Sequence, residues 1–359
     1  MSQKVFAVVL TLVLLATIVL PAAAQTPAPA TGAAVTETVA TTPIPPIKKV
    51  DTGGKVYQIV YIPKNTGNPY FDSIINGFKK AGEELGYEFS TVAPSTAEGT
   101  GQIPFIKEQT QRGVNAIAIS PNDPDAVVPA LKQAMAKGIR VVCVNSDMNK
   151  EGREVAVLPM DFGITGSSQV ELLGSVINYE GEIAILSATT TAPDQNTWIE
   201  GMKVALKDPK YAKMKLVKIA YGDDDPQKSY TEAQALLTAF PNLKGIISPT
   251  TVGVAAAAQA VETAKAADKV QVVGLGTPNQ MRRFIQNKTI TKFALWSPYD
   301  EGYLSGYMIY GMLTDQVKPA PGVKFAVPRL GEREFLADNV VITGPPKVWD
   351  IKNIDEDNF

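Results

Sequence analysis

The sequence predicts an α/β fold of two lobes, each a doubly wound parallel sheet, with a hinge between them. Three observations lead to this prediction. Short apolar runs alternate with longer amphipathic runs from Val56 onward, which is the pattern of βαβ units. The apolar runs are hydrophobic on both faces, as are the strands of a parallel sheet that helices cover. The alternation begins again after "VAVLP" (155–159), so the chain holds two such series.

The first series contains four predicted strands, "VYQIVYI", "YEFSTV", "NAIAIS" and "IRVVCVNS". Helical patterns separate them, at 71–85, 99–112 and 124–137. A glycine follows each helix, where glycine commonly ends helices. These glycines are Gly86, Gly113 and Gly138.

The second series predicts strands at "GEIAILSA", "KLVKIAYG", "KGIISP" and "VQVVGLG". Its helices are expected at 163–177, 195–207, 229–239 and 252–264. We assign 53–159 and 278–318 to the N-terminal lobe, and 160–277 and 319–359 to the C-terminal lobe. The chain is expected to cross between the lobes, and to bend there, near 158–161, 276–279 and 316–322.

The N-terminus has the layout of an export signal. One lysine precedes an apolar stretch from Val5 to Leu20, and an A-x-A-like site follows at Ala22 to Ala24. Residues 1–24 are therefore predicted to be a cleaved secretory signal peptide, with an uncleaved membrane anchor as the alternative. Residues 25–52, rich in Pro, Thr and Ala, are expected to form an extended linker. The protein is expected to work in the periplasm or otherwise outside the cytoplasm.

Composition argues against several classes of function. The 359 residues contain no histidine, the commonest general base and zinc ligand, so we expect no enzyme, metal site or cofactor. Lys and Arg number 34 against 36 Asp and Glu, a net charge of −2, which leaves no positive field to attract nucleic acid. The one cysteine, Cys143, lies in an apolar run and is predicted to be a buried hydrophobe.

Two motifs receive ordinary structural interpretations. Asp223 to Asp225 superficially resemble a metal cluster, but no second ligand set shares their spacing, and we interpret them as a solvated turn. "GLGTPN" lacks the third glycine of a dinucleotide loop, because Asn279 stands in its place. We therefore do not interpret it as a dinucleotide-binding motif.

Polar residues follow the predicted strands. In open α/β sheets, ligands bind beyond the carboxyl ends of the strands, so these residues are expected to line one cleft. Carboxylates and amides pair with hydroxyl groups, and aromatic rings cover C–H faces, so such a cleft suits a sugar. The segments concerned include "PKNTGNPYF", "NSDMN", "TAPDQNTW", "GDDDPQKSY", "SPTTVG" and "WSPYD".

Several of these segments, with "PTTVGVAAAAQA", "VVGLGTPNQM" and "NIDEDNF", resemble a known family from Val56 to Phe359. This family is the type I periplasmic sugar-binding proteins of ABC transporters, and the similarity points to its rhamnose-binding and autoinducer-2-binding subgroup. The resemblance implies a monomeric protein that captures a monosaccharide, with a rhamnose-like deoxyhexose favoured, and delivers it to an ABC permease in the membrane. An autoinducer-2 receptor for uptake or signalling is the alternative.

The resemblance also assigns ligand-binding residues. Autoinducer-2 receptors typically hold their ligand with a lysine, an aspartate, an Asp-Gln pair, a proline and an alanine. Asn145 stands at the aspartate position and Thr251 at the alanine position, and both changes alter hydrogen-bonding capacity. The segments "PTTVGV" and "YGDD" fit the rhamnose-binding proteins better, and we therefore favour a rhamnose-like sugar. The matching residues are Lys64, Asp194, Gln195 and Pro249.

Each candidate also has an ordinary structural alternative. Asp194 is expected to accept from ligand hydroxyls, and its alternative is to cap the following helix. Lys64 is otherwise a surface lysine, and Asn145 and Thr251 are otherwise turn residues. Three aromatic residues complete the predicted site, with packing in the core as their alternative. They are Tyr70, Phe71 and Trp296.

Overall fold

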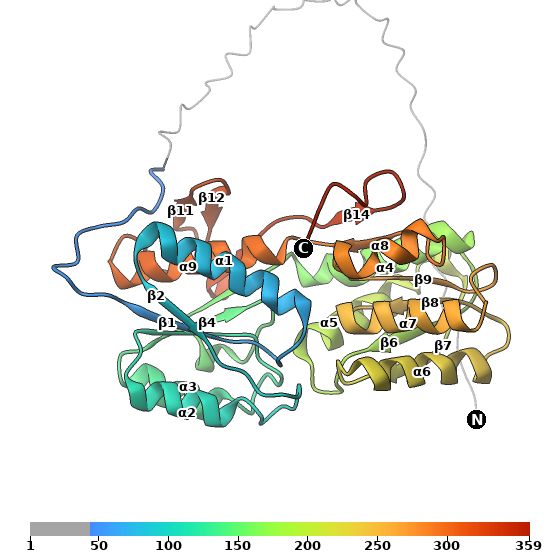
Figure 1. Cartoon of the computed structure of the whole chain (residues 1–359), viewed down its shortest axis with the longest axis horizontal. Helices are drawn as coiled ribbons and strands as arrows, with labels where there is room; N and C mark the ends of the chain where they lie inside the picture. Colours follow the sequence, from blue (N-terminus) through green and yellow to red (C-terminus); the bar gives the residue numbers. More distant parts are fainter. Residues whose placement is uncertain (1–43) are drawn as a thin grey trace, which may run out of the picture. The chain divides into compact units, whose positions relative to one another are not determined.

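The structure is a computed structural model that describes residues 44–359. The predicted signal peptide and residues 25–43 of the predicted linker lie outside the described residues. Among the described helices, none combines the length and apolar character that a bilayer span needs. The predicted α/β fold class is confirmed, with two parallel sheets that helices cover on both faces (Figure 1).

The first sheet has six parallel strands in the order β13-β5-β4-β3-β1-β2. These are β1 (Gln58–Ile62), β2 (Glu88–Thr91), β3 (Ala116–Ile119), β4 (Arg140–Val144), β5 (Val155–Leu158) and β13 (Val340–Ile342). Along β1, side chains alternate between two cores, because successive residues of a strand face opposite sides of the sheet. Ile59 and Tyr61 join one core, and Val60 and Ile62 the other.

Figure 1 shows two layers of helices around this sheet, α1 and α9 on one face and α2 and α3 on the other. They are α1 (Pro69–Leu85), α2 (Ile103–Arg112), α3 (Val128–Ala136) and α9 (Pro298–Leu313). A short 3₁₀ turn, η1 (Lys150–Gly152), precedes β5, and another, η3 (Ala337–Asn339), precedes β13. Cys143 of β4 is buried and free, as predicted.

The second sheet has four parallel strands in the order β7-β6-β8-β9. They are β6 (Glu180–Ser187), β7 (Lys213–Tyr221), β8 (Leu243–Ser248) and β9 (Gln271–Gly274). Its helices are α4 (Phe162–Ile177), α5 (Pro193–Ala205), α6 (Pro226–Ala239), α7 (Thr251–Thr263) and α8 (Pro278–Gln286), with a 3₁₀ turn η2 (Pro209–Tyr211). Helix α4 packs on α5, and α6 packs on α7, in two layers as in the first sheet.

All seven helices predicted from the two series are present, with shifted ends. Three begin two or three residues earlier than predicted, each on a proline: Pro69, Pro193 and Pro226. Proline suits the first turn because its fixed φ is helical and its missing N–H needs no partner. Gly86 and Gly113 end α1 and α2 in the left-handed conformation, with φ of 83° and 70°, as predicted.

The C-terminal segments contact both sheets. Within 278–318, only α9 packs against α1, whereas α8 contacts α7 and β10 (Phe293–Leu295) bridges to the residue after β9. Within 319–359, β13 joins the first sheet, and β14 (Lys347–Trp349) pairs with β10. The hairpin of β11 (Lys324–Val327) and β12 (Gly331–Glu334) packs near α9.

The chain passes between the two sheets at 159–161, 296–297 and 343–346. Each of these segments connects an element that packs with one sheet to an element that packs with the other. Only the first coincides with a predicted crossing. The crossings predicted at 276–279 and 316–322 do not coincide with these segments, since α8 and β10 stay beside the second sheet and the hairpin of β11 and β12 packs near α9 and β13. The division into lobes remains a prediction, and the packing favours a boundary at Trp296.

The end of the predicted linker is part of the folded body. Ile47 is buried, and its backbone N–H donates to the carbonyl of Ala326 in β11 at 2.9 Å. The backbone N–H of Val50 donates to the Tyr310 hydroxyl of α9 at 3.1 Å. Burial of the Ile47 side chain in the core offsets the entropy lost when this segment is ordered. The composition of the segment alone did not reveal this contact.

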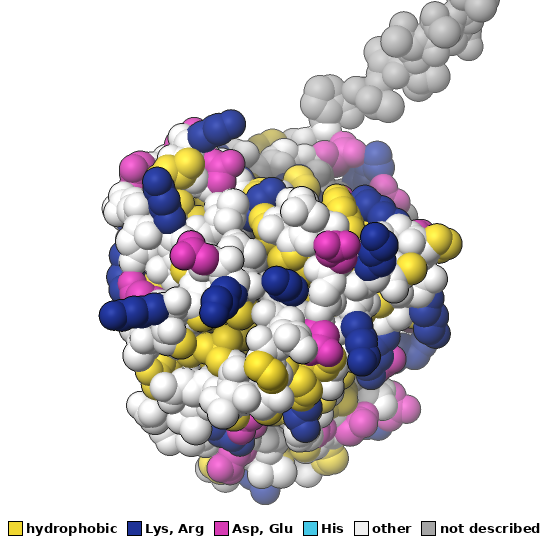
Figure 2. Space-filling view, turned by 90° about the vertical axis from the view of Figure 1, so that its right-hand side faces the viewer, with side chains coloured by type: hydrophobic (Ala, Val, Ile, Leu, Met, Phe, Trp, Pro, Cys, Tyr) yellow, Lys and Arg dark blue, Asp and Glu magenta, His cyan; other side chains and the backbone are white. Residues whose placement is uncertain are grey.

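Charges of both signs are interspersed on the face shown in Figure 2. This distribution agrees with a net charge of −2. The face carries no large field of a single sign.

Helices α1 and α9 cross at very short range. A Cβ placed on Gly302 of α9 would lie 1.9 Å from the carbonyl oxygen of Ile74 in α1. A Cβ on Gly77 of α1 would lie 2.1 Å from the carbonyl oxygen of Tyr299. Each helix therefore uses a glycine to admit the other's backbone. This contact fixes α9, and with it the residues that begin α9, against the first sheet.

Replacing Gly302 with alanine tests this contact. In a free helix the change stabilises by about 0.5–1 kcal/mol. Here the methyl group meets backbone, so we expect a net loss of about 1–3 kcal/mol in the free energy of unfolding, measured by urea denaturation. Gly344→Ala is the control, because nothing lies within 4 Å of a Cβ there. Equal stability of both variants would contradict the close crossing.

Candidate functional site

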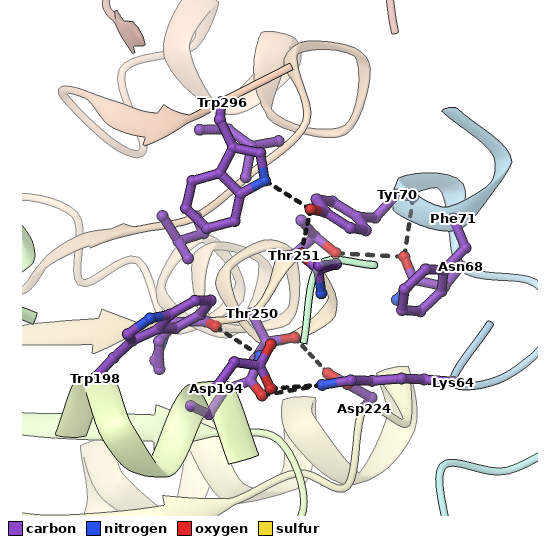
Figure 3. A pocket seen from close by; sticks show the side chains of 15 residues that line it. Lys64, Asn68, Tyr70, Phe71, Asp194, Trp198, Asp224, Thr250, Thr251 and Trp296 are labelled. Carbon is purple, nitrogen blue, oxygen red and sulfur yellow. Dashed lines mark hydrogen bonds and ion pairs between the residues drawn. The ribbon is translucent and has the colours of Figure 1, made fainter. Parts of the chain in front are cut away.

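The predicted site residues meet around one cavity. Fifteen side chains line it (Figure 3), and they come from both sheets. All of the residues predicted from the sequence are among them: Lys64, Tyr70, Phe71, Asn145, Asp194, Gln195, Pro249, Thr251 and Trp296. Their role in binding remains a prediction.

Parallel strands explain this convergence, because the carboxyl ends of parallel strands lie at one edge of a sheet. From the first sheet, Lys64 follows β1 and Asn145 follows β4. From the second sheet, Asp194 lies in α5 after β6, and Pro249 follows β8. Trp296 stands where the chain crosses from β10 to α9.

A buried ion pair joins the two sides of the cavity. Lys64 Nζ lies 2.7 Å from Asp194 Oδ1, and the two side chains are 3% and 0% exposed. Figure 3 shows Lys64 reaching across the cavity to the carboxylate. Among residues 44–359, the buried Asp194 Oδ2 has no hydrogen-bond partner. A buried carboxylate oxygen without a partner is costly, so this atom is ready to accept a hydrogen bond from a ligand.

Gln195 extends this contact to a third strand end. Its Oε1 accepts from Lys64 Nζ at 3.3 Å, and its Nε2 donates to the carbonyl of Pro249 at 3.3 Å. The N-cap of α5 is Ala192, with no side-chain cap hydrogen bond. Asp194 therefore does not cap the helix, although its charge in the first turn suits the helix dipole.

A second polar cluster surrounds the Tyr70 hydroxyl. Trp296 Nε1 donates to it at 2.6 Å, and the hydroxyl also contacts Asn145 Oδ1 at 2.5 Å and Glu301 Oε2 at 2.8 Å. Burial is the main reason that the pKa of Tyr70 lies well above its usual value. The hydroxyl is therefore neutral at physiological pH.

Asn68 and Thr251 connect the starts of α1 and α7. Asn68 caps α1 by accepting from the backbone N–H of Tyr70 at 3.1 Å, and Thr251 Oγ1 donates to the same Asn68 oxygen at 3.3 Å. Asn145 has a φ of 69°, a left-handed conformation that asparagine tolerates. The turn role proposed for Asn145 therefore coexists with its position at the cavity.

Six lining residues were not predicted as site residues. Asp224 is a correction, because we interpreted 223–225 as a solvated turn, and Asp224 is buried and hydrogen-bonded to Thr250. Burial raises its pKa, and nearby Lys64 opposes the shift. The polar segments after β6 and β7 contained the signal for Trp198 and Asp224, but spacing does not tell which side of a turn faces inward. The six are Asn68, Trp198, Asp224, Thr250, Leu275 and Leu295.

The cavity is small, at about 30 Å³, which is room for one or two water molecules. Ligand sites usually measure about 300–1,000 Å³. A ligand must therefore part some side chains, and the Lys64–Asp194 pair lies in the middle. A larger space of about 580 Å³ lies beside the cavity, because Asn68 and Asp224 line both.

Comparisons with known proteins agree with this geometry. Residues 59–316 match a family described as a periplasmic binding protein domain. An ABC transporter solute-binding protein from Clostridium phytofermentas with bound L-rhamnose is 33% identical, with a TM-score of 0.81, and the match covers 84% of this chain and 98% of that one.

Two further proteins are more distant. LsrB from Clostridium saccharobutylicum in complex with AI-2 is 24% identical, with a TM-score of 0.79, over 84% of this chain and 100% of that one, which shows a shared fold. The D-ribose/D-allose-binding protein of Pseudomonas aeruginosa is 26% identical over 60% of this chain and 70% of its own length.

A double-mutant cycle measures the buried ion pair. Lys64→Met, Asp194→Asn and the double variant are compared with the wild type by urea denaturation without ligand. We expect a coupling energy of about 1–3 kcal/mol, because each single change leaves a buried charge without its partner. The control is the Lys203–Glu200 pair of α5, whose side chains are 42% and 70% exposed and should couple by about 0.5 kcal/mol or less. Equal coupling in the two pairs would show that Lys64 and Asp194 are solvated.

Proposed function

The chain belongs to the periplasmic binding protein family and is the sugar-binding component of an ABC transporter, and from this premise we propose that it captures one neutral monosaccharide, a rhamnose-like deoxyhexose. It is a binding protein and not an enzyme. The observation that carries the proposal is the cavity itself, where residues from both sheets present charge, amides and rings to one point.

The chemistry of the lining suits a sugar ring. Asp194 Oδ2 can accept from a hydroxyl, and Lys64 can donate to one. The two buried indoles, Trp198 and Trp296, lie at an interplanar angle of 66° with 5.7 Å between ring centroids, and they offer surfaces to C–H faces. Lys64 and Asp194 already pair with each other, so a ligand of no net charge leaves the charges of that pair balanced.

Apolar side chains favour a deoxyhexose. Phe71, Leu275 and Leu295 line the cavity together with the indoles. A methyl group gains from such a wall, whereas a hydroxyl in the same place would lose its hydrogen bonds. One methyl-sized difference in an apolar pocket discriminates by about 10- to 200-fold. The solved relative with bound L-rhamnose also supports this choice.

Autoinducer-2 is the second candidate. The relative that holds AI-2 supports it, and so do Lys64, Asp194, Gln195 and Pro249 at the positions assigned by resemblance. Asn145 and Thr251 differ in hydrogen-bonding capacity from the aspartate and alanine expected there. The loss of one charged hydrogen bond costs about 1.5–3 kcal/mol, so we rank the sugar first.

Ligand capture would proceed by closure. Because Lys64 and Asp194 stand on opposite sides of the cavity, a ligand that contacts both favours the closed arrangement. The three crossing segments at 159–161, 296–297 and 343–346 would serve as the hinge. The closed protein, secreted and monomeric in this proposal, would then dock on a membrane permease.

A ligand screen tests the proposal. Purified protein is titrated by calorimetry with L-rhamnose, other aldoses and autoinducer-2, and we expect L-rhamnose or a related deoxyhexose to bind near 1 μM, or about −8.2 kcal/mol. Asp194→Ala should weaken binding at least about 100-fold, because two hydroxyl contacts of about 1.5 kcal/mol each are lost. Glu200→Ala, an exposed change in the same helix, should bind as the wild type does.

Circular dichroism shows whether Asp194→Ala keeps its fold. Tighter binding of autoinducer-2 than of any sugar would replace the first candidate with the second. Failure of every sugar and of autoinducer-2 to bind would refute the proposed function.

A further inference from the structure

The Tyr70 hydroxyl contacts three polar groups, and each contact needs a hydrogen atom. An indole nitrogen only donates, so Trp296 supplies the hydrogen between Trp296 and Tyr70. Tyr70 has one hydrogen of its own for its two oxygen neighbours, Asn145 Oδ1 at 2.5 Å and Glu301 Oε2 at 2.8 Å. One of these contacts therefore joins two oxygens and needs a hydrogen from elsewhere.

Two arrangements supply that hydrogen. In the first, Glu301 is protonated and donates to Tyr70, while Tyr70 donates to Asn145 Oδ1. In the second, the Asn145 amide is turned so that its nitrogen donates to Tyr70, and Tyr70 donates to an ionised Glu301. The arrangements differ in the charge of Glu301, so the surroundings of its side chain decide between them.

The surroundings of Glu301 disfavour a charge. Glu301 lies in the first turn of α9 and is 0% exposed. Within the described part of the chain, its Oε1 is buried without a hydrogen-bond partner, and its Oε2 has one hydrogen-bond partner, Tyr70. Within residues 44–359, no lysine or arginine forms an ion pair with it. The start of a helix favours a negative charge, but this effect is small beside an unpaired buried carboxylate.

The neighbouring ionisable groups act in the same direction. Asp194 from α5 and Asp300 from α9 add negative charge near Glu301, although Lys64 pairs with the first and Arg329 with the second. The buried phenols of Tyr61 and Tyr70 also face Glu301. Burial first, and then these carboxylates, raise the pKa of Glu301 well above its usual value, against the hydrogen bond with Tyr70.

We propose that Glu301 is a neutral carboxylic acid that donates to Tyr70 and thereby sets the direction of hydrogen bonds at the ligand cavity. Tyr70 then donates to Asn145 Oδ1 and fills one of the two acceptor positions of this oxygen. The Asn145 amide nitrogen makes a long contact of 3.4 Å with Ser146, so it is the part of the amide that we assign to donate to a ligand. Glu301 is a positioning residue in this scheme, since it does not line the cavity.

The consequence for specificity rests on the proposed function. Asn145 offers the sugar a donor, where an aspartate would offer an acceptor. Lys64 also donates. Asp194 Oδ2 can accept, because within residues 44–359 it has no other hydrogen-bond partner. The ligand therefore presents an accepting oxygen, such as a ring oxygen or a hydroxyl lone pair, to Asn145, and a hydroxyl hydrogen to Asp194.

Infrared difference spectroscopy tests the charge without any ligand. The spectrum of the wild type at pH 7 minus that of Glu301→Gln should contain the C=O stretching band of a protonated carboxyl group. Glu84→Gln is the matched control, because Glu84 likewise contacts tyrosine hydroxyls but accepts hydrogen bonds from them. Its partners are Tyr303 at 2.6 Å and Tyr307 at 2.5 Å, both of α9. These hydrogen bonds and Lys80 outweigh partial burial and lower the pKa of Glu84, so its difference spectrum should show ionised carboxylate bands. Absence of the protonated band at Glu301 would overturn the proposal.

Stability gives a second, independent readout. In the unfolded chain a glutamic acid has a pKa of about 4.3. If Glu301 stays protonated in the folded state above that pH, unfolding releases its proton, and the free energy of unfolding falls as the pH rises. The wild type should therefore lose stability relative to Glu301→Gln between pH 5 and pH 8. A constant difference over this range would contradict a neutral Glu301.

Ligand binding connects the acid to specificity. Glu301→Leu removes the donor and should weaken sugar binding at least tenfold, whereas Glu301→Gln, whose amide can donate to Tyr70, should restore most of the affinity. Asn145→Asp should weaken binding at least tenfold at pH 7 by replacing the donor. Undiminished binding by Asn145→Asp would overturn the assigned direction. If no sugar binds the wild type, the proposed function fails, while the infrared and stability results still decide the state of Glu301.

Discussion

The contact between Lys64 and Asp194 holds the two halves of the site together. Lys64 follows β1 of the first sheet, and Asp194 lies in the first turn of α5 beside the second sheet. Both side chains are buried, and Lys64 Nζ lies 2.7 Å from Asp194 Oδ1. Two buried charges persist only when each has the other and further hydrogen bonds. Gln195 supplies one of these by accepting from Lys64, and Asp194 Oδ2 remains open for another. The geometry of the cavity therefore depends on a pair that is satisfied internally but can still accept a ligand.

This arrangement bears on how a ligand could enter. In a cavity of about 30 Å³, the pair occupies space that a sugar would need. A ligand that separates the pair must give each charged group a new hydrogen-bond partner. Its hydroxyls therefore have to donate to Asp194 and accept from Lys64. Selectivity then follows from the cost of leaving either charge unpaired. With Glu301 protonated as proposed, the Tyr70 cluster on the other side of the cavity orients amide and hydroxyl groups without adding charge.

Glycine contacts support the site from a distance. The crossing of α1 and α9 through Gly77 and Gly302 places the start of α9, with Glu301, behind the start of α1, with Tyr70. Helices α4 and α5 approach similarly, since a Cβ on Gly166 would lie 2.3 Å from the carbonyl oxygen of Trp198. Backbone positions near the cavity are thus fixed by close packing, which is stiff, and the polar side chains take their places from that frame.

The sequence by itself determined the fold class, the helices of both series and the residues at the strand ends. Apolar periodicity and glycine or proline at helix ends are local properties, and parallel strands bring their carboxyl ends together whatever the loops contain. Hence the polar segments at the strand ends could be named before their contacts were known, and the resemblance to a known family then singled out Lys64, Asp194 and Pro249 within them. Only the tertiary structure decided where the chain crosses between the sheets, that Asp224 turns inward, and that Glu301 meets Tyr70 across 231 positions of sequence. Those features depend on which surfaces pack together, and the free energy of packing depends on contacts between distant segments, which no local pattern records.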